Sequence, residues 1–76
     1  MLNADLELDA RGLNCPLPIL RTRKSINALK TGQVLKVIAT DPGSVKDLEA
    51  FCKQTGHEML ASDLENGEYH FNIRKG

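Results

Sequence analysis

The sequence predicts a small α+β fold, a two-layer α/β sandwich with the element order β-α-β-α-β-β. Period-two alternation in short segments, helical spacing of apolar residues in longer ones, and turns rich in Gly and Pro between them support this prediction. With 76 residues the chain has no room for a second core, so we expect one domain over residues 1–76. Its four strands should form one mixed sheet, with both helices on one face.

The first half of the chain predicts a strand, a helix and a second strand. Residues 5–9 alternate leucines with acidic side chains, which is typical of a half-buried strand. A helix is expected over about residues 16–29, with Gly32 as a left-handed stop. The β-branched segment 34–39 predicts the second strand.

The next segment predicts a turn and a second helix. Residues 41–43, Asp-Pro-Gly, form the expected turn. Ser44 followed by Asp47 resembles a capping box in which Asp replaces the usual Glu or Gln. Helical spacing of apolar residues continues over about 45–54 and is closed by Gly56.

The last third of the chain predicts a β-hairpin. Residues 57–62 and 68–74 flank an Asn-Gly turn at 65–67, which is a strong hairpin signal. Right-handed crossovers place both helices on one face of the sheet and start each at the carboxyl end of the preceding strand. The start of the first helix and the 41–43 turn should therefore share one edge. Residues 41–44 are expected to serve chiefly as turn and helix cap, and a contact surface on the Cys15 edge is their functional alternative.

Composition excludes several classes of protein. Ten Lys plus Arg balance ten Asp plus Glu, which argues against a protein that binds nucleic acid directly by neutralising its phosphates. Two cysteines are too few for a secreted disulfide scaffold, and we expect reduced thiols and a cytoplasmic location. The first residues do not resemble a signal peptide, and neither a membrane segment nor a metal site is expected. So small a chain should lack a deep substrate pocket.

The most informative stretch is Cys15-Pro16-Leu17-Pro18. Proline is tolerated in the first helical turn, so Pro16 and Pro18 predict that Cys15 occupies the helix N-cap. Cys is a poor capping residue, which favours a chemical role over a merely structural one. The free N–H of Leu17 and the helix dipole would then favour a thiolate. Nearby cationic side chains are candidate stabilisers of that thiolate: Arg11, Arg21 and Lys24.

The helical wheel separates two faces of the first helix. One face should pack on the sheet and carries Ile19, Thr22, Ile26 and Leu29. Leu17 and Leu20 lie off that face, where they would form an exposed apolar spot beside Cys15 for a docking partner. The alternative is that both leucines pack under the loop 11–14.

From Leu8 to Pro18 the chain reads Leu-Asp-Ala-Arg-Gly-Leu-Asn-Cys-Pro-Leu-Pro, which resembles the Leu-Asp-x-x-Gly-x-x-Cys-Pro-x-Pro signature of the TusA/SirA family of sulfur carrier proteins. The similarity continues to residues 73–76 and covers nearly the whole chain. It implies that Cys15 accepts a sulfane sulfur as a persulfide from a cysteine desulfurase or a rhodanese-like sulfurtransferase. The sulfur would pass to the cysteine of a DsrE-like acceptor, in tRNA 2-thiouridine synthesis or in sulfur oxidation.

The resemblance implies a carrier with sulfurtransferase-type chemistry rather than a conventional enzyme. Thiol exchange of this kind requires no metal, no nucleotide and no other cofactor. We expect the free carrier to be monomeric.

Two other functions stay open on the residues alone. Cys15 could belong to a thiol redox or regulatory module, although no well-placed resolving cysteine accompanies it. A small RNA-binding domain is the other alternative, which neutral charge and few aromatic residues disfavour.

Cys52 is expected in the core without a disulfide to Cys15, and His57 and His70 are expected to be ordinary surface residues.

Overall fold

The computed structural model describes residues 4–76 and has the expected order of elements. The strands are β1 (Leu6–Ala10), β2 (Val34–Ala39), β3 (Glu58–Glu65) and β4 (Glu68–Arg74). The helices are α1 (Leu17–Asn27) and α2 (Ser44–Thr55). The prediction of a β-α-β-α-β-β sandwich is therefore confirmed.

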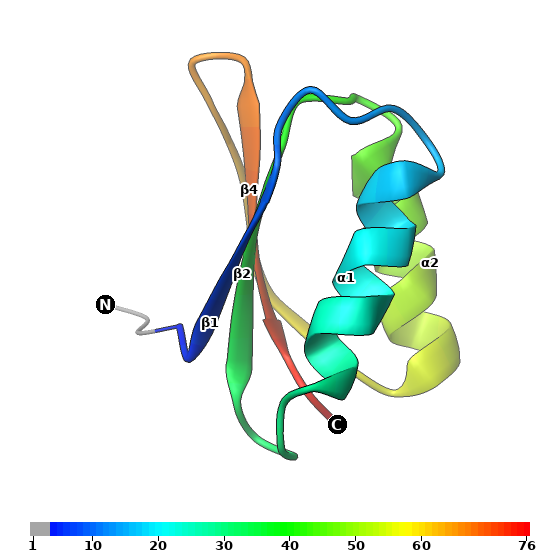
Figure 1. The fold of residues 1–76 in the computed structure, drawn as a ribbon, viewed down its shortest axis with the longest axis vertical. Coiled ribbons are helices and arrows are strands. Elements are labelled where there is room, and N and C mark those ends of the chain that lie inside the picture. The colour runs from blue at the N-terminus through cyan, green and yellow to red at the C-terminus, as the bar shows by residue number, and fades with distance from the viewer. Residues whose placement is uncertain (1–3) are drawn as a thin grey trace.

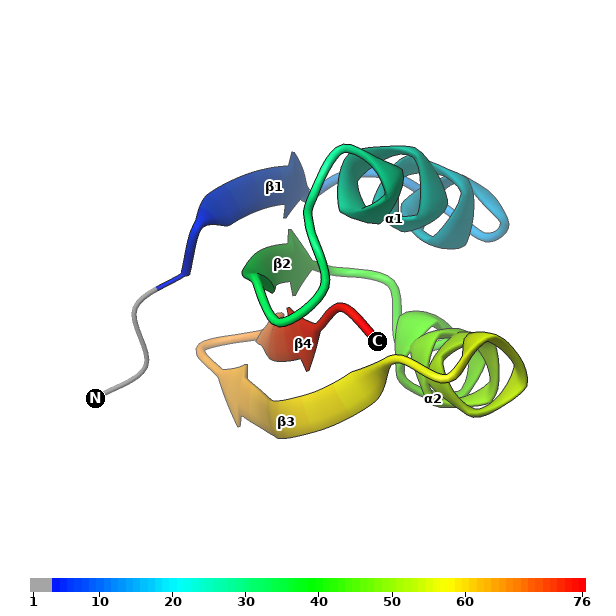
Figure 2. The ribbon, with the colours of Figure 1, turned by 90° about the horizontal axis from the view of Figure 1, so that it is seen from below.

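All four strands form a single mixed sheet in the order β1-β2-β4-β3, as the view along the strands shows (Figure 2). β1 and β2 are parallel, with Ala10 opposite Ala39 at their carboxyl ends. β4 pairs antiparallel with both β2 and β3. The parallel pair matters for function because the segments that leave β1 and β2 emerge side by side at one edge.

Both helices cover the same face of the sheet (Figure 1). The core lies between the layers and is built from the strand residues that point toward the helices, among them Leu35, Val37, Phe71 and Ile73, each with no exposed surface. The wheel prediction for α1 is confirmed, since Ile26 and Thr22 are fully buried. Within residues 4–76 no helix covers the opposite face of the sheet (Figure 1), where the charged or polar side chains of Asp9 and His70 flank Ile38.

The predicted end of α2 is confirmed, whereas the predicted end of α1 is wrong. Gly56 closes α2 in the left-handed conformation with φ of 80°, and its N–H donates to the Cys52 carbonyl at 3.0 Å, as predicted. The prediction for α1 is wrong: the helix ends at Asn27, with Ala28 at the C-cap in a right-handed conformation. Gly32 does have φ of 92°, but it serves the turn before β2, where its N–H bonds to the Lys75 carbonyl.

The hairpin turn is confirmed by its backbone. Asn66 and Gly67 have φ of 49° and 78°, and positive φ at both central residues defines the turn type that Asn-Gly favours. β3 is longer than expected and runs to Glu65, directly into the turn. No helix in residues 4–76 is long and apolar enough to cross a membrane.

Candidate functional site: the Cys15 edge of the sandwich

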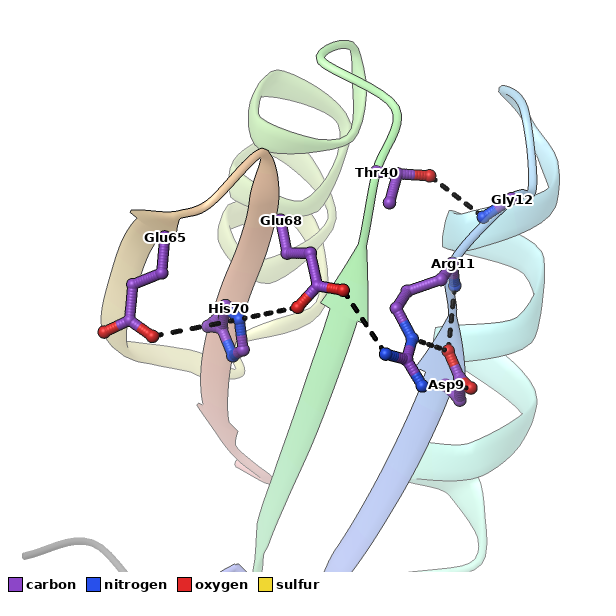
Figure 3. Close-up of polar contacts among 7 residues, drawn as sticks. All are labelled: Asp9, Arg11, Gly12, Thr40, Glu65, Glu68 and His70. Atoms are coloured by element: carbon purple, nitrogen blue, oxygen red, sulfur yellow. Dashed lines mark hydrogen bonds and ion pairs between the residues drawn. The ribbon is translucent and has the colours of Figure 1, made fainter.

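Two hydrogen bonds tie the loop after β1 to the segment that follows β2. The Gly12 N–H donates to Thr40 Oγ1 at 2.9 Å (Figure 3), and the Cys15 N–H donates to Asp41 Oδ2 at 2.9 Å. The other oxygen of Asp41 accepts from the Gly43 N–H at 3.3 Å. The predicted meeting of the α1 start and the 41–43 turn is confirmed, and the Asp41 carboxylate connects the two.

Cys15 itself lies one residue outside the position expected for it. Pro16, not Cys15, occupies the N-cap of α1, and no side chain caps this helix. The Leu17 N–H is not free for the thiol, because it donates to the Asn14 carbonyl at 2.8 Å. Pro18 is buried in the first turn. The N-cap prediction is therefore wrong, because the turn formed by Asn14 and Leu17 satisfies the donor that we expected to reach the sulfur.

The Cys15 thiol is exposed and faces a carboxylate rather than a cation. Its Sγ lies 3.1 Å from Asp47 Oδ2, so the thiol donates a hydrogen bond to Asp47. This bond, together with some loss of solvation and the negative charges of Asp47 and Asp41, raises the pKa of Cys15. The expectation that the site favours a thiolate is wrong for the free protein.

The cationic residues named from sequence do not gather around the thiol. The Arg11 guanidinium pairs with Asp9 at 2.9 Å and reaches Glu68 at 3.3 Å across the helix-free face of the sheet (Figure 3). This pairing, through the hydrogen bond from Arg11, lowers the pKa of Asp9 to about 2. Arg21 and Lys24 are exposed on α1, and within residues 4–76 neither forms an ion pair or a hydrogen bond to Cys15. The expected cationic setting is corrected to an acidic one.

The apolar spot beside the cysteine is present. Leu17 and Leu20 have 42% and 48% of their surface exposed. Both follow Cys15 on the outer side of α1, away from the sheet. Their exposure contradicts packing under the loop 11–14 and confirms an accessible apolar surface near the thiol.

Asp47 is the residue at this edge whose contact the sequence analysis missed. The sequence predicts that Asp47 forms a capping box with Ser44, but Gly43 is the N-cap of α2 and no side chain caps the helix there. The Ser44 hydroxyl and the Ser44 N–H both donate to the Asp41 carbonyl, at 2.6 and 3.0 Å. The Asp47 carboxylate does not bond to that N–H and instead accepts from Cys15. The available signal was topological: parallel neighbouring strands place the starts of both helices together.

The second cysteine and the two histidines lie away from the Cys15 thiol and contact other parts of the fold. Cys52 is 4% exposed, and both cysteines are free thiols, as predicted. His57 is half-buried, accepts the Gly76 N–H on Nδ1 at 3.0 Å and packs on Phe51. His70 lies on the helix-free face, 3.5 Å from Glu68 (Figure 3). In residues 4–76 no three His, Cys, Asp or Glu side chains are grouped to hold a metal ion.

A small sandwich that presents one exposed thiol at the edge of its sheet has the architecture of a thiol-bearing carrier protein. The family model described as Sulfurtransferase TusA matches residues 6–75. The chain therefore belongs to the TusA family, and it is a sulfur carrier protein of that family.

Similar proteins agree with this assignment in sequence and in structure. The chain is 64% identical over 75 residues to the sulfur carrier protein TusA of Allochromatium vinosum, covering 99% of both chains. It is 49% identical over 71 residues to the sulfur carrier protein TusA of Pseudomonas entomophila, covering 93% of this chain and 89% of that one. The crystal structure of a SirA-like protein from Desulfitobacterium hafniense superposes with a TM-score of 0.82 at 26% identity, covering 93% of this chain and 97% of that one.

Proposed function

We propose that Cys15 carries the sulfur, which it accepts as a persulfide from a cysteine desulfurase or a rhodanese-like donor and delivers to a DsrE-like acceptor cysteine. The observation that supports this role is the contrast in access between the two thiols. Cys15 is exposed at the edge of the sandwich, whereas Cys52 is buried. A sulfur held on another protein's cysteine can approach only an exposed thiol.

The transfer is a thiol exchange in which atoms and electrons balance. The Cys15 sulfur attacks the terminal sulfur of the donor persulfide, a new S–S bond forms, and the donor's S–S bond breaks. The donor cysteine leaves as a thiolate and takes up the proton that the Cys15 thiol gives up. Delivery repeats the exchange with the acceptor cysteine as nucleophile and Cys15 as the leaving group.

The surface beside Cys15 supports docking of a protein rather than of a small molecule. Leu17 and Leu20 supply exposed apolar area, and the outer side of α1 adds Arg21 and Lys24 without any acidic residue in the helix. These side chains would contact the partner while the sulfurs approach one another. We place this relay in the cytoplasm, where thiols stay reduced, with transfer to tRNA 2-thiouridine synthesis or to sulfur oxidation.

The direct test measures the intact mass after incubation with a cysteine desulfurase, cysteine and pyridoxal phosphate. We expect the wild-type chain to gain the mass of one sulfur atom. Cys15→Ser should gain none, and the matched control Cys52→Ser should gain as much as wild type. If neither desulfurases nor rhodaneses load Cys15, or if loading persists in Cys15→Ser, the proposal is wrong.

A further inference from the structure

The hydrogen bond between Cys15 and Asp47 joins segments that are 32 residues apart. Asp47 lies in the first turn of α2, and its backbone N–H bonds to the Gly43 carbonyl at 3.2 Å. On the other side, the Cys15 N–H is held by Asp41 at 2.9 Å. Both the backbone and the side chain of Cys15 are therefore oriented by carboxylates, which places the sulfur at a set distance from Asp47.

The charges around the sulfur are negative. Asp41 comes from the segment between β2 and α2, and Asp47 comes from α2. Within residues 4–76 neither carboxylate takes part in an ion pair, since the ion pairs of that region involve only Arg11, His70 and Arg74. On the β1 side, Arg11 is directed to Asp9 and Glu68, and on α1 no cation bonds to Cys15. Within residues 4–76, no Lys or Arg side chain pairs with Asp41, with Asp47 or with the Cys15 sulfur.

We propose that Asp47 is a positioning residue for the transfer reaction, and that its carboxylate keeps the proton on the Cys15 sulfur while the carrier is empty and free. This inference rests on the proposed function and deepens it. A thiolate is the nucleophile in thiol exchange, whereas a thiol is nearly inert. The free carrier is thereby held in its less reactive form, which protects Cys15 from small electrophiles and oxidants until a donor docks.

The contact of Asp47 with the Cys15 sulfur can be distinguished from a purely structural role of Asp47 in α2. A carboxylate in the first helical turn stabilises α2 through the helix dipole, so loss of its charge changes stability in either case. Only a contact that acts on the sulfur also changes the pH at which Cys15 becomes reactive. The pH dependence of Cys15 alkylation separates the two roles.

The experiment follows alkylation of the empty carrier by iodoacetamide over about pH 6 to 10, a range that brackets ordinary thiol titration, with Cys15 read by peptide mass spectrometry. We expect Asp47→Asn and Asp47→Ser to lower the pH midpoint by about one unit, so Cys15 reacts on the order of 10-fold faster at neutral pH. Glu49→Gln is the matched control, because Glu49 is exposed on the same helix and loses the same charge. It should leave the midpoint unchanged.

An unchanged midpoint in both folded Asp47 variants, or an equal shift in Glu49→Gln, overturns the inference. Asp47→Ser is a second neutral variant with a smaller side chain, and it keeps the inference testable if the Asn variant does not fold. The assay contains no sulfur donor, so it is independent of the persulfide experiment. A failure to load Cys15 would refute the proposed function, whereas a fixed midpoint would refute only the role of Asp47.

Discussion

The thiols of the two cysteines both have a raised pKa, but the cause of the shift differs between them. For Cys15 the main cause is the hydrogen bond to Asp47, and the side chain is exposed. For Cys52 the cause is burial alone, in the stripe that α2 turns toward the sheet. One helix thus acts on both: its first turn supplies the carboxylate that faces Cys15, and its inner face encloses Cys52. Elevated pKa by itself does not distinguish a site thiol from a core thiol; access does.

The largest expected difference between the two thiols is in their rate of modification. In the native protein at neutral pH, a disulfide reagent such as dithiobis-nitrobenzoate should modify Cys15 roughly 100-fold faster than Cys52, because reaction at Cys52 requires local opening. In guanidinium chloride both should react at similar rates. Comparable native rates would remove the contrast on which the assignment of Cys15 depends.

Substitution by serine should lower the free energy of unfolding more at Cys52 than at Cys15. Cys52→Ser places a hydroxyl in an apolar core and should lower the free energy of unfolding by about 1–3 kcal/mol. Cys15→Ser alters an exposed side chain and should change it by less than about 0.5 kcal/mol. Urea denaturation followed by circular dichroism measures both, and equal losses would contradict the burial contrast.

The surface around Cys15 can be probed without touching the thiol. Leu20→Ala should slow sulfur loading by a donor protein several-fold, as expected for one apolar contact of about 1 kcal/mol at an interface. Leu64→Ala is the matched control, because Leu64 is also exposed, at 61%, but lies on β3. Loading rates come from time-resolved intact mass. Equal rates for both variants would show that the apolar spot does not take part in docking.

The smallest effect concerns Arg11, which the structure assigns to the helix-free face instead of the Cys15 thiol. The guanidinium lowers the pKa of Asp9 from 3.8 to about 2. The ion pair therefore stabilises the folded state at pH values above the pKa of Asp9 in the unfolded chain, and this stabilisation is lost as the pH falls from 3.8 to about 2. Asp9→Asn should flatten the dependence of unfolding free energy on pH in that window. The Cys15 alkylation midpoint should be the same in Asp9→Asn as in wild type.

Local signals predicted the fold well, but they misassigned the residues at both helix starts. The Asn66–Gly67 turn and the Gly56 cap depend on backbone preferences of a few neighbouring residues, so the sequence specifies them directly. The N-cap assignment of Cys15 failed for a local reason that the two prolines did not reveal: Asn14 and Leu17 form their own turn. The capping-box prediction for Asp47 is wrong because a capping box and a carboxylate that bonds elsewhere have the same sequence pattern.

By itself the sequence determined the order of elements, the burial of Cys52 and the edge on which Cys15 lies, whereas it left open whether Leu17 and Leu20 are exposed. These follow from hydrophobic periodicity, turn chemistry and the handedness of crossovers, which act over short distances or constrain topology. Only the tertiary structure decided the charge around the thiol. Asp47 reaches Cys15 across 32 residues and Arg11 reaches Glu68 across 57. Such partners depend on the register of β1 against β2 and on the placement of β4, and no local pattern encodes them.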